Sequence, residues 1–287
     1  MEQMQQLNPR KDTASNAEIM FMVINASAVT IIPINILMYR AELGSANPCA
    51  VFIPILIATS ASSLAGFLAV ALVQKLPIFN RVVLAYLLGF VAFIGGLAHY
   101  FANLDDASRL TYSESAGNFI LFLIIAAFIG FGAVKRLNVY ETFITGAKEG
   151  FDIAVKIIPY LVAMLTAIAV LRASGVMDMF VLGIERLVTW FNADTGFVPA
   201  LPTAFIKPLS GSGARAMMIE TLQTYGADSF AGFVSSVIQG STETTFYVLA
   251  IYFGAIKVVK IRHALPCALF ADLIGIMTAI YVSYLFY

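Results

Sequence analysis

Apolar stretches close to the length of a bilayer crossing recur from one end of this sequence to the other. A transmembrane helix needs about 20 mostly apolar residues, because in lipid only hydrogen bonds within the helix can satisfy its backbone. The sequence therefore predicts an all-α, polytopic membrane protein with about seven spans. The candidate spans cover residues 19–39, 49–73, 82–101, 118–134, 153–171, 230–258 and 265–287.

Composition favours a lipid environment over a soluble fold. Of the 287 residues, 60% are hydrophobic and 12% are charged, whereas roughly a quarter of a soluble domain is charged. The formal net charge of +0 gives no support for nucleic-acid binding. Cys49 and Cys267 lie in apolar stretches outside any CxxC motif, which favours packing over disulfide or metal chemistry. With no HExxH, GxSxG or metal-ligand cluster, we expect neither an enzyme nor a bound cofactor or metal.

Three further segments are too short or too mixed to be simple spans. Residues 137–151 and 177–191 alternate apolar and charged side chains, which is typical of amphipathic helices at the membrane interface. Residues 197–225 contain two short apolar runs joined at Pro208 and a Gly-Ser-Gly sequence. This pattern favours a re-entrant helical hairpin that dips into the membrane and returns. A single kinked span is the alternative.

Basic residues indicate the orientation, since they are enriched on the cytoplasmic side. If residues 197–225 form a re-entrant hairpin, nine basic residues that precede or join the spans fall on one side. The N-terminus is then cytoplasmic and the C-terminus outside. These groups are Arg10, Lys11, Lys75, Arg81, Lys135, Arg136, Lys257, Lys260 and Arg262.

The beginning and the end of the chain share a short pattern. The sequence INAS at 24–27 can be laid on IQGS at 238–241, and Pro48-Cys49 then corresponds to Pro266-Cys267 after a four-residue insertion. On the predicted topology the two copies have opposite orientations. Inverted repeats with broken helices are typical of secondary transporters, whose sites lie where the repeats meet.

Several motifs resemble a known family. KEGF at 148–151, IIPYLVAM at 157–164, PLSGSGA at 208–214, QGSTETTFYV at 239–248 and RHALP at 262–266 resemble spore maturation protein B. DTASNA at 12–17 and GSANP at 44–48 resemble the C-terminal part of spore maturation protein A. Both belong to the nucleoside-recognition (Gate) superfamily, which is similar to gate regions of concentrative nucleoside transporters. The resemblance implies a bacterial inner (plasma) membrane protein.

The resemblance divides the chain into three parts. Residues 1–76 correspond to a partial A-like Gate half, residues 77–136 to a linking helix pair, and residues 137–287 to a B-like Gate domain. The A-like family carries an Asn- and Gly-rich broken helix before the DTASNA stretch. We therefore expect an A–B fusion that lacks the N-terminal portion of its A-like half.

Polar residues within the apolar stretches are the candidate binding residues. A carboxylate inside a span is costly unless it is paired, protonated or exposed to a cavity, which makes Glu243 the most informative position. Substrate or proton binding is one interpretation, and a structural polar cluster is the other. The candidate substrate-binding set is Ser210, Gly211, Ser212, Gly213, Gln239, Gly240, Ser241, Thr242, Glu243, Thr244, Asn25 and Ser27.

The Gly-Ser-Gly joint could present free N–H groups and a positive helix end to an anionic group. Lys207 and Arg215 flank this joint, and each could pair with Glu243 or a ligand, or extend to the headgroups. Asn25, laid on Gln239, could face the same site or bond a neighbouring helix. Asp272 lies in the last span, with Arg262 and His263 toward its basic end, which suggests a structural ion pair.

Two functions fit these features. The first is a permease for a small polar metabolite, with nucleoside-like or carboxylate compounds suggested by the resemblance alone. The second is a membrane scaffold or regulator that carries no solute and acts with a partner membrane subunit. A homo-oligomer is compatible with either function.

Overall fold

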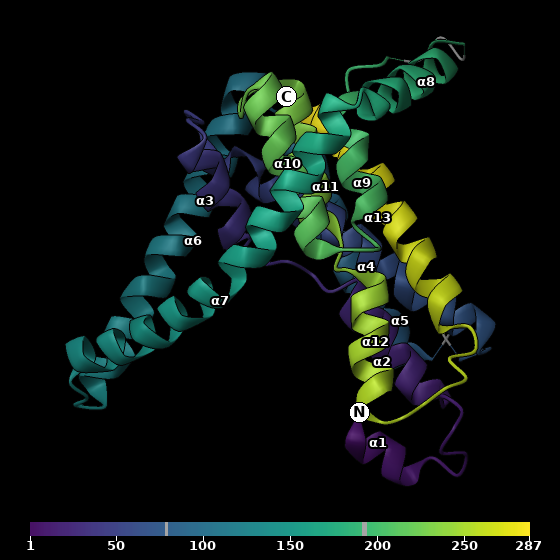
Figure 1. Ribbon diagram of the computed structural model, residues 1–287. Helices are drawn as coiled ribbons and strands as arrows, with labels where there is room; N and C mark the ends of the chain where they lie inside the picture. The colour runs from purple at the N-terminus through teal and green to yellow at the C-terminus, as the bar shows by residue number, and fades with distance from the viewer. Residues whose placement is uncertain (78–79, 191–193) are drawn as a thin grey trace.

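The computed structural model describes residues 1–77, 80–190 and 194–287, and the regular structure in these ranges is helical. The predicted all-α class is therefore confirmed. Figure 1 shows the helices in sequence order. They are α1 Glu2–Leu7, α2 Asn16–Ala26, α3 Ile34–Glu42, η1 Pro48–Val51, α4 Phe52–Val73, α5 Arg81–Ala102, α6 Asp106–Val134, α7 Val139–Ala173, α8 Val176–Trp190, η2 Val198–Ala200, α9 Leu201–Ile206, α10 Gly211–Tyr225, α11 Phe230–Ser241, α12 Thr245–Ala255 and α13 Ala264–Phe286.

Four helices of the described chain are long and apolar enough to cross a membrane. They are η1 with α4, α5, the greater part of α6, and α13. Each corresponds to a stretch that the sequence predicted as a span. The predicted interfacial helix 137–151 and the predicted span 153–171 form one continuous helix, α7. The predicted helix 177–191 is observed as α8, and its last predicted residue, Phe191, lies outside the described residues.

The first predicted span, residues 19–39, is not one helix. α2 ends at Ala26, and α3 begins at Ile34 after an irregular segment. Pro33 lacks an N–H and restricts the residue before it to extended backbone. The β-branched residues Thr30, Ile31 and Ile32 lower helix propensity further, so the interruption starts before the proline itself.

α4 and α13 pack against each other in antiparallel directions. Gln74, just beyond the end of α4, contacts His263 at the start of α13, while Ser62 in the middle of α4 donates to the carbonyl of Ala271. The contact is close because small residues face each other: a Cβ built on Gly275 would lie 2.9 Å from the Cβ of Ser62. Small residues at membrane helix interfaces permit this approach.

α2 and α11 run toward the middle of α13 from its opposite ends. Arg262, just before α13, donates to the carbonyl of Ala14 and to Asn16 at the start of α2. At the other end of α13, the ring of Tyr287 packs against Phe230, the first residue of α11. The two helices therefore end near the centre of the protein.

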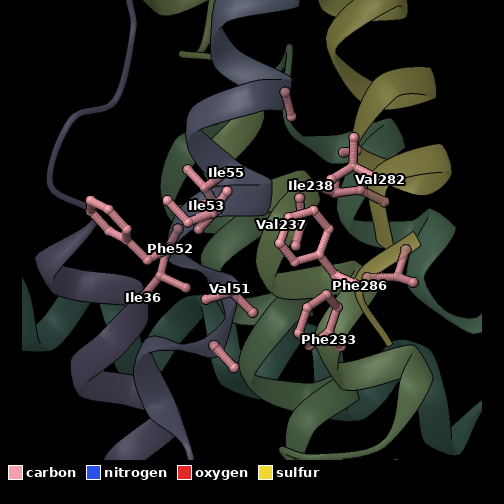
Figure 2. Close-up of a cluster of buried hydrophobic side chains, with 14 of the residues drawn as sticks. Ile36, Val51, Phe52, Ile53, Ile55, Phe233, Val237, Ile238, Val282 and Phe286 are labelled. Carbon is pink, nitrogen blue, oxygen red and sulfur yellow. The ribbon is translucent and has the colours of Figure 1, made fainter. Parts of the chain in front are cut away.

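The largest apolar cluster lies between α3, η1, α4, α11 and α13 (Figure 2). Phe233 and Val237 of α11 face Phe286 and Val282 of α13, and Ile55 of α4 completes this layer. These side chains are almost fully buried. This part of the chain thus forms a packed body that can hold a site rigidly.

The helices α5, α6 and α7 are different, because most of their described side chains are exposed. α6 runs away from the packed body and α7 returns toward it from their common turn, and α8 projects from the opposite end of the molecule (Figure 1). In the most apolar 18-residue stretch of α5, 0% of the residues are buried, and in that of α6, 6% are buried. Their apolar side chains are therefore available to lipid or to another protein.

Residues 197–225 fold back on themselves. α9 and α10 are separated at Lys207–Ser210. After this break, α10 runs back, so that its end lies near the segment that precedes α9. A Cβ on Gly196 would lie 3.1 Å from the ring of Phe230, which follows α10 by a short loop. The predicted helix–break–helix hairpin is present.

Candidate functional site

The chain is interrupted a second time between α11 and α12. Thr242 has an extended backbone (φ −147°, ψ 170°), and α12 restarts at Thr245. The backbone N–H of Glu243 donates to the carbonyl oxygen of Ala26 at 3.0 Å. The interruption that follows α11 therefore satisfies a backbone group at the end of α2, which has no partner within its own helix.

The tip of the α9–α10 hairpin contacts the chain on both sides of this interruption. The N–H of Phe246 donates to the carbonyl of Pro208 at 3.0 Å. Lys207 is 5% exposed, and its ammonium donates to the carbonyl of Gln239 at 2.8 Å, near the end of α11. A cation at this position is favourable, because helix carbonyls carry a partial negative charge at their C-terminal end.

Glycines allow these segments to approach closely. A Cβ on Gly211 would lie 2.5 Å from Oγ1 of Thr244, and one on Gly240 would lie 2.7 Å from the side chain of Ile55. Contacts this short leave no room for a larger residue. The hairpin tip, the α11–α12 interruption and α4 are thus packed directly against each other.

A cavity of about 420 Å³ lies where the two interrupted helices and the hairpin meet. The segment from Thr30 to Ile36 forms one wall, and the end of α11 with the following residues forms another. Lys207, Gly211 and Arg215 contribute from the hairpin. The cavity size is within the usual range for small-molecule sites, about 300–1,000 Å³.

The cavity carries charge of both signs. Its charged lining residues in the described chain are Lys207, Arg215 and Glu243. The side chain of Glu243 is exposed and lines the cavity, whereas Lys207 is buried and lies within electrostatic reach of Glu243. An anionic group could pair with the two cations, and a cationic or hydroxyl group with the carboxylate.

Six of the twelve residues predicted to bind a substrate line this cavity: Gly211, Gln239, Gly240, Thr242, Glu243 and Thr244. Ser210 caps α10, and its hydroxyl accepts from the N–H of Gly213. Ser212 contacts Ser210, and the hydroxyl of Ser241 donates to the carbonyl of Ile238. These residues shape the surrounding backbone.

Asn25 and Ser27 do not line the cavity. Asn25 donates to the carbonyl of Phe21 and accepts from the hydroxyl of Tyr252, and it lines a separate apolar groove. The hydroxyl of Ser27 donates to the carbonyl of Val23. Both side chains therefore bond within α2 or to α12, and the residues from Thr30 onward reach the cavity instead.

The residues from Thr30 to Tyr39, at the break between α2 and α3, were not selected from the sequence as candidate binding residues. Ile32, Asn35 and Tyr39 line the cavity together with Thr30 and Pro33. The available signal was Pro33, which marks a break in a predicted span. The residues on both sides of such a break lie where backbone groups are free to meet a ligand.

The predicted ion pair of Asp272 with Arg262 or His263 is wrong. Asp272 accepts a hydrogen bond from the hydroxyl of Thr245 at 2.7 Å. Arg262 bonds to Ala14 and Asn16 instead, and His263 contacts Gln74. Asp272 lies more than two helical turns from both basic residues, so they cannot reach it.

Cys49 and Cys267 are buried and form no disulfide, which agrees with the expected packing role.

Comparison with known proteins identifies the family. A family model described as "Gate: Nucleoside recognition" matches residues 154–258. The chain is also 44% identical to spore maturation protein B of Bacillus subtilis (strain 168) over 160 residues, which is 56% of this chain and 88% of that protein. The chain belongs to the spore maturation protein A/B family. The family model includes the hairpin and the α11–α12 interruption, so the cavity is built largely from the Gate region.

No solved structure is significantly similar to the chain. The resemblance of residues 1–76 to spore maturation protein A stays a prediction. The Gate region supplies the hairpin and one interrupted helix, and α2 with α3 supplies the other.

Proposed function

We propose that the chain is a permease-type membrane protein for a small polar metabolite. The observation that carries this proposal is the meeting of two interrupted helices and a hairpin tip at one charged cavity. Broken helices are costly in a membrane and occur where backbone groups line a cavity or contact other protein. A protein that only held partners together would have no use for them.

The arrangement of the helices supports an inverted repeat. α2, α3 and α4 form one set of a broken helix followed by a span, and α11, α12 and α13 form the other. α4 is antiparallel to α13, and α2 approaches the centre from the opposite end to α11. Such sets, related by an axis in the membrane plane, place a substrate site at their junction.

Basic residues support a cytoplasmic N-terminus. Lys75, Arg136 and Lys257 follow the C-terminal ends of α4, α6 and α12, each with a positive φ between 52° and 56°. The N-terminus and the α6–α7 turn lie toward the same end of the view in Figure 1. The positive-inside rule then assigns this end to the cytoplasm of a bacterial inner membrane and the C-terminus to the outside.

The ligand that fits this cavity is small, polar and partly anionic. Lys207 and Arg215 can pair with a carboxylate, while Glu243 and Asn35 can bond hydroxyl or amino groups. A carboxylate metabolite satisfies these groups, and the description of the matching family adds nucleoside-like compounds. Both classes are to be tested.

Uptake by proteoliposomes tests the proposal. The purified chain is reconstituted and supplied with a bacterial metabolite extract, and the internal solutes are compared with those of empty liposomes. We expect a few polar compounds to accumulate, and Glu243→Gln to reduce their uptake. The matched control is Glu42→Gln, which changes an exposed carboxylate at the end of α3 outside the cavity. Equal solute contents with and without protein would refute transport by this chain.

A scaffold that acts with a partner subunit is the second candidate. It is favoured by the exposed apolar faces of α5, α6 and α7, which the packed body leaves uncovered. An exposed face of this kind accepts lipid or another membrane helix. Crosslinking in native membranes between an α6 cysteine variant and a second membrane protein, together with no solute accumulation in liposomes, would favour the scaffold.

A further inference from the structure

Asp272 is a buried acid that the cavity lining does not include. It lies near the middle of α13 and is 2% exposed. The helices α2, α4, α11 and α12 that pack on α13 carry one charged residue among them, Glu18, which bonds Ser15 and Asn8 at the start of α2. A carboxylate in such surroundings needs a counter-charge, a proton or a bound cation. Lys207 of the hairpin lies within electrostatic reach of it, but its ammonium donates to the carbonyl of Gln239.

The oxygen atoms beside Asp272 are incompletely bonded. Its Oδ2 accepts from Thr245, but its Oδ1 has no partner within the described chain. Thr242 is also 2% exposed and lies within hydrogen-bonding range of this carboxyl, although its Oγ1 forms no hydrogen bond of good geometry within the described chain. The methyl group of Thr242 packs on α13, where a Cβ added to Gly275 would lie 2.7 Å from it. Buried polar atoms without partners are rare, and they point to a missing bound group.

A cation or a proton fits this position better than an anion. Carboxylate and hydroxyl oxygens accept hydrogen bonds and bind hard cations. The C-terminal end of α11, at Ser241, adds partial negative charge next to Thr242. Unwound backbone and the C-terminal ends of half-helices provide Na⁺ and H⁺ sites in secondary transporters.

We propose that Asp272 and Thr242 form a cation site, occupied by Na⁺ or by a proton on the carboxyl, whose occupancy is coupled to anion binding in the cavity. Thr242 connects the two, since it contacts α13 on one side and lines the cavity on the other. The coupling between the cation and the anion rests on the proposed function, but cation binding itself can be measured without transport.

Charge balance supplies the coupling. The groups facing this region are Lys207, Arg215, Glu243 and Asp272, and Lys207 is within electrostatic reach of each of the other three. Arg81 lies at the start of α5, and Arg109 lies at the start of α6, where it donates to the carbonyl of Leu285. Both residues are far from the middle of α13. Two cations and two carboxylates are neutral together. An anionic ligand would add a negative charge, which a cation at Asp272 balances, so each ligand would favour binding of the other.

The sodium arm of the test uses radioactive Na⁺ and the purified chain in nanodiscs, with choline replacing unlabelled sodium. If Na⁺ is the ligand, the wild type binds it, and Asp272→Asn and Thr242→Val reduce binding to the level of empty nanodiscs. Thr278→Val is the matched control, because Thr278 lies on the same helix and bonds the carbonyl of Ile274. This control should retain binding.

The proton arm uses infrared difference spectra between alkaline and acidic buffers. Other carboxyl groups of the chain also protonate on acidification, so the Asp272 signal is the component of the wild-type spectrum that Asp272→Asn lacks. If a proton is the ligand, this component is present in the wild type and in Thr278→Val. It is shifted in Thr242→Val, because the hydroxyl changes the bonding of the carboxyl.

The two arms decide the matter together. No sodium binding, combined with identical carboxyl bands in the wild type and Asp272→Asn, would overturn the cation site. A protein that binds the cation but accumulates no metabolite would instead contradict the proposed transport and leave the cation site standing. Uptake by Asp272→Asn equal to that of the wild type would contradict the coupling alone.

Discussion

The N–H of Glu243 and the carbonyl of Ala26 form a hydrogen bond of 3.0 Å between residues at opposite ends of the chain. Each residue lies at an interruption of a helix. Backbone groups freed by an interruption must find a partner in the membrane interior. The two broken helices thus stabilise each other, and the geometry of the cavity depends on their close contact.

This close contact predicts that Gly240→Ala destabilises the protein. A Cβ at this position would lie 2.7–2.9 Å from three carbons of Ile55, which is itself fully buried. Overpacking of this kind costs about 1–3 kcal/mol. The measurement is the midpoint of thermal unfolding in detergent, which should fall.

Gly254→Ala is the matched control, since Gly254 lies in α12 with no atom within 4 Å of an added Cβ. Alanine should leave the unfolding midpoint unchanged or raise it slightly, because Gly254 lies in the last turn of α12 and glycine is unfavourable in a helix. Combining Gly240→Ala with Ile55→Val should recover part of the loss. Equal unfolding midpoints for the two alanine variants would show that α11 and α4 are not closely packed.

A second prediction concerns Arg40, a buried arginine that joins α3 to the loop before α11. Its guanidinium bonds the carbonyl of Ala227 at 2.7 Å and the carboxylate of Asp228 at 3.0 Å. Arg40→Met should destabilise the protein by about 3 kcal/mol, the lower part of the range for a broken buried pair. The lower value applies because Asp228 is 45% exposed and stays solvated.

Chemical denaturation of the reconstituted protein measures this loss. Arg81→Met is the control, because Arg81 is exposed at the start of α5. Asp228→Asn should cost less than Arg40→Met, since the amide can still accept a hydrogen bond from the guanidinium. A larger effect of Asp228→Asn would mean that the carboxylate, and not the buried arginine, holds the two segments together.

The sequence predicted much of this site because polar residues within apolar stretches are conspicuous. The Gly-Ser-Gly joint and the QGSTET stretch both mark real interruptions, and both reach the cavity. Helix continuity was harder to predict. Residues 19–39 are apolar enough to form a span, and hydropathy cannot distinguish Thr30 to Pro33 in a helix from the same residues in an irregular segment.

Side-chain direction and tertiary contacts were beyond the sequence. Asn25 aligns with Gln239, yet it bonds within its own helix and faces another groove. Asp272 is paired with Thr245 on a different helix, a contact that no local pattern indicates. The proposed cation site consists of hydroxyl and carboxylate oxygens, so a search of the sequence for His and Cys clusters does not find it. These features depend on how distant helices are packed together.

A third prediction concerns Lys207. Its buried ammonium donates to the carbonyl of Gln239 and lies within electrostatic reach of Glu243 and Asp272. Removing one member of a buried charged group leaves its partners uncompensated, which destabilises a protein. Lys207→Met should therefore lower the unfolding temperature, and the protein that remains folded should not take up an anionic solute. Lys148→Met, which changes an exposed lysine on α7, should leave uptake unchanged. Normal uptake by Lys207→Met would exclude Lys207 from ligand binding.

The last prediction concerns pH and the contact between the N-terminal segment and the loop after α12. The carboxylate of Asp12 pairs with the ammonium of Lys260 at 3.0 Å, and the carbonyl of Asp12 accepts from the N–H groups of Val259 and Lys260. The hydrogen bond from Lys260 lowers the pKa of Asp12 below its ordinary value of 3.8. A lowered pKa means that the folded protein binds this proton less readily than the unfolded chain. The carboxylate therefore contributes stability above pH 3.8, and this contribution is lost as the pH falls through the lower pKa of the folded state.

Because both side chains are exposed, the contribution is small and screened by salt. It should appear as a slightly higher unfolding temperature of the wild type than of Asp12→Asn at neutral pH and low salt. The difference should vanish below the pKa of Asp12 and in concentrated salt. Asp12→Asn keeps the backbone bonds to Val259 and Lys260, so it isolates the carboxylate. A difference between the two proteins that persists in acid would assign the effect to the asparagine side chain instead of the ion pair.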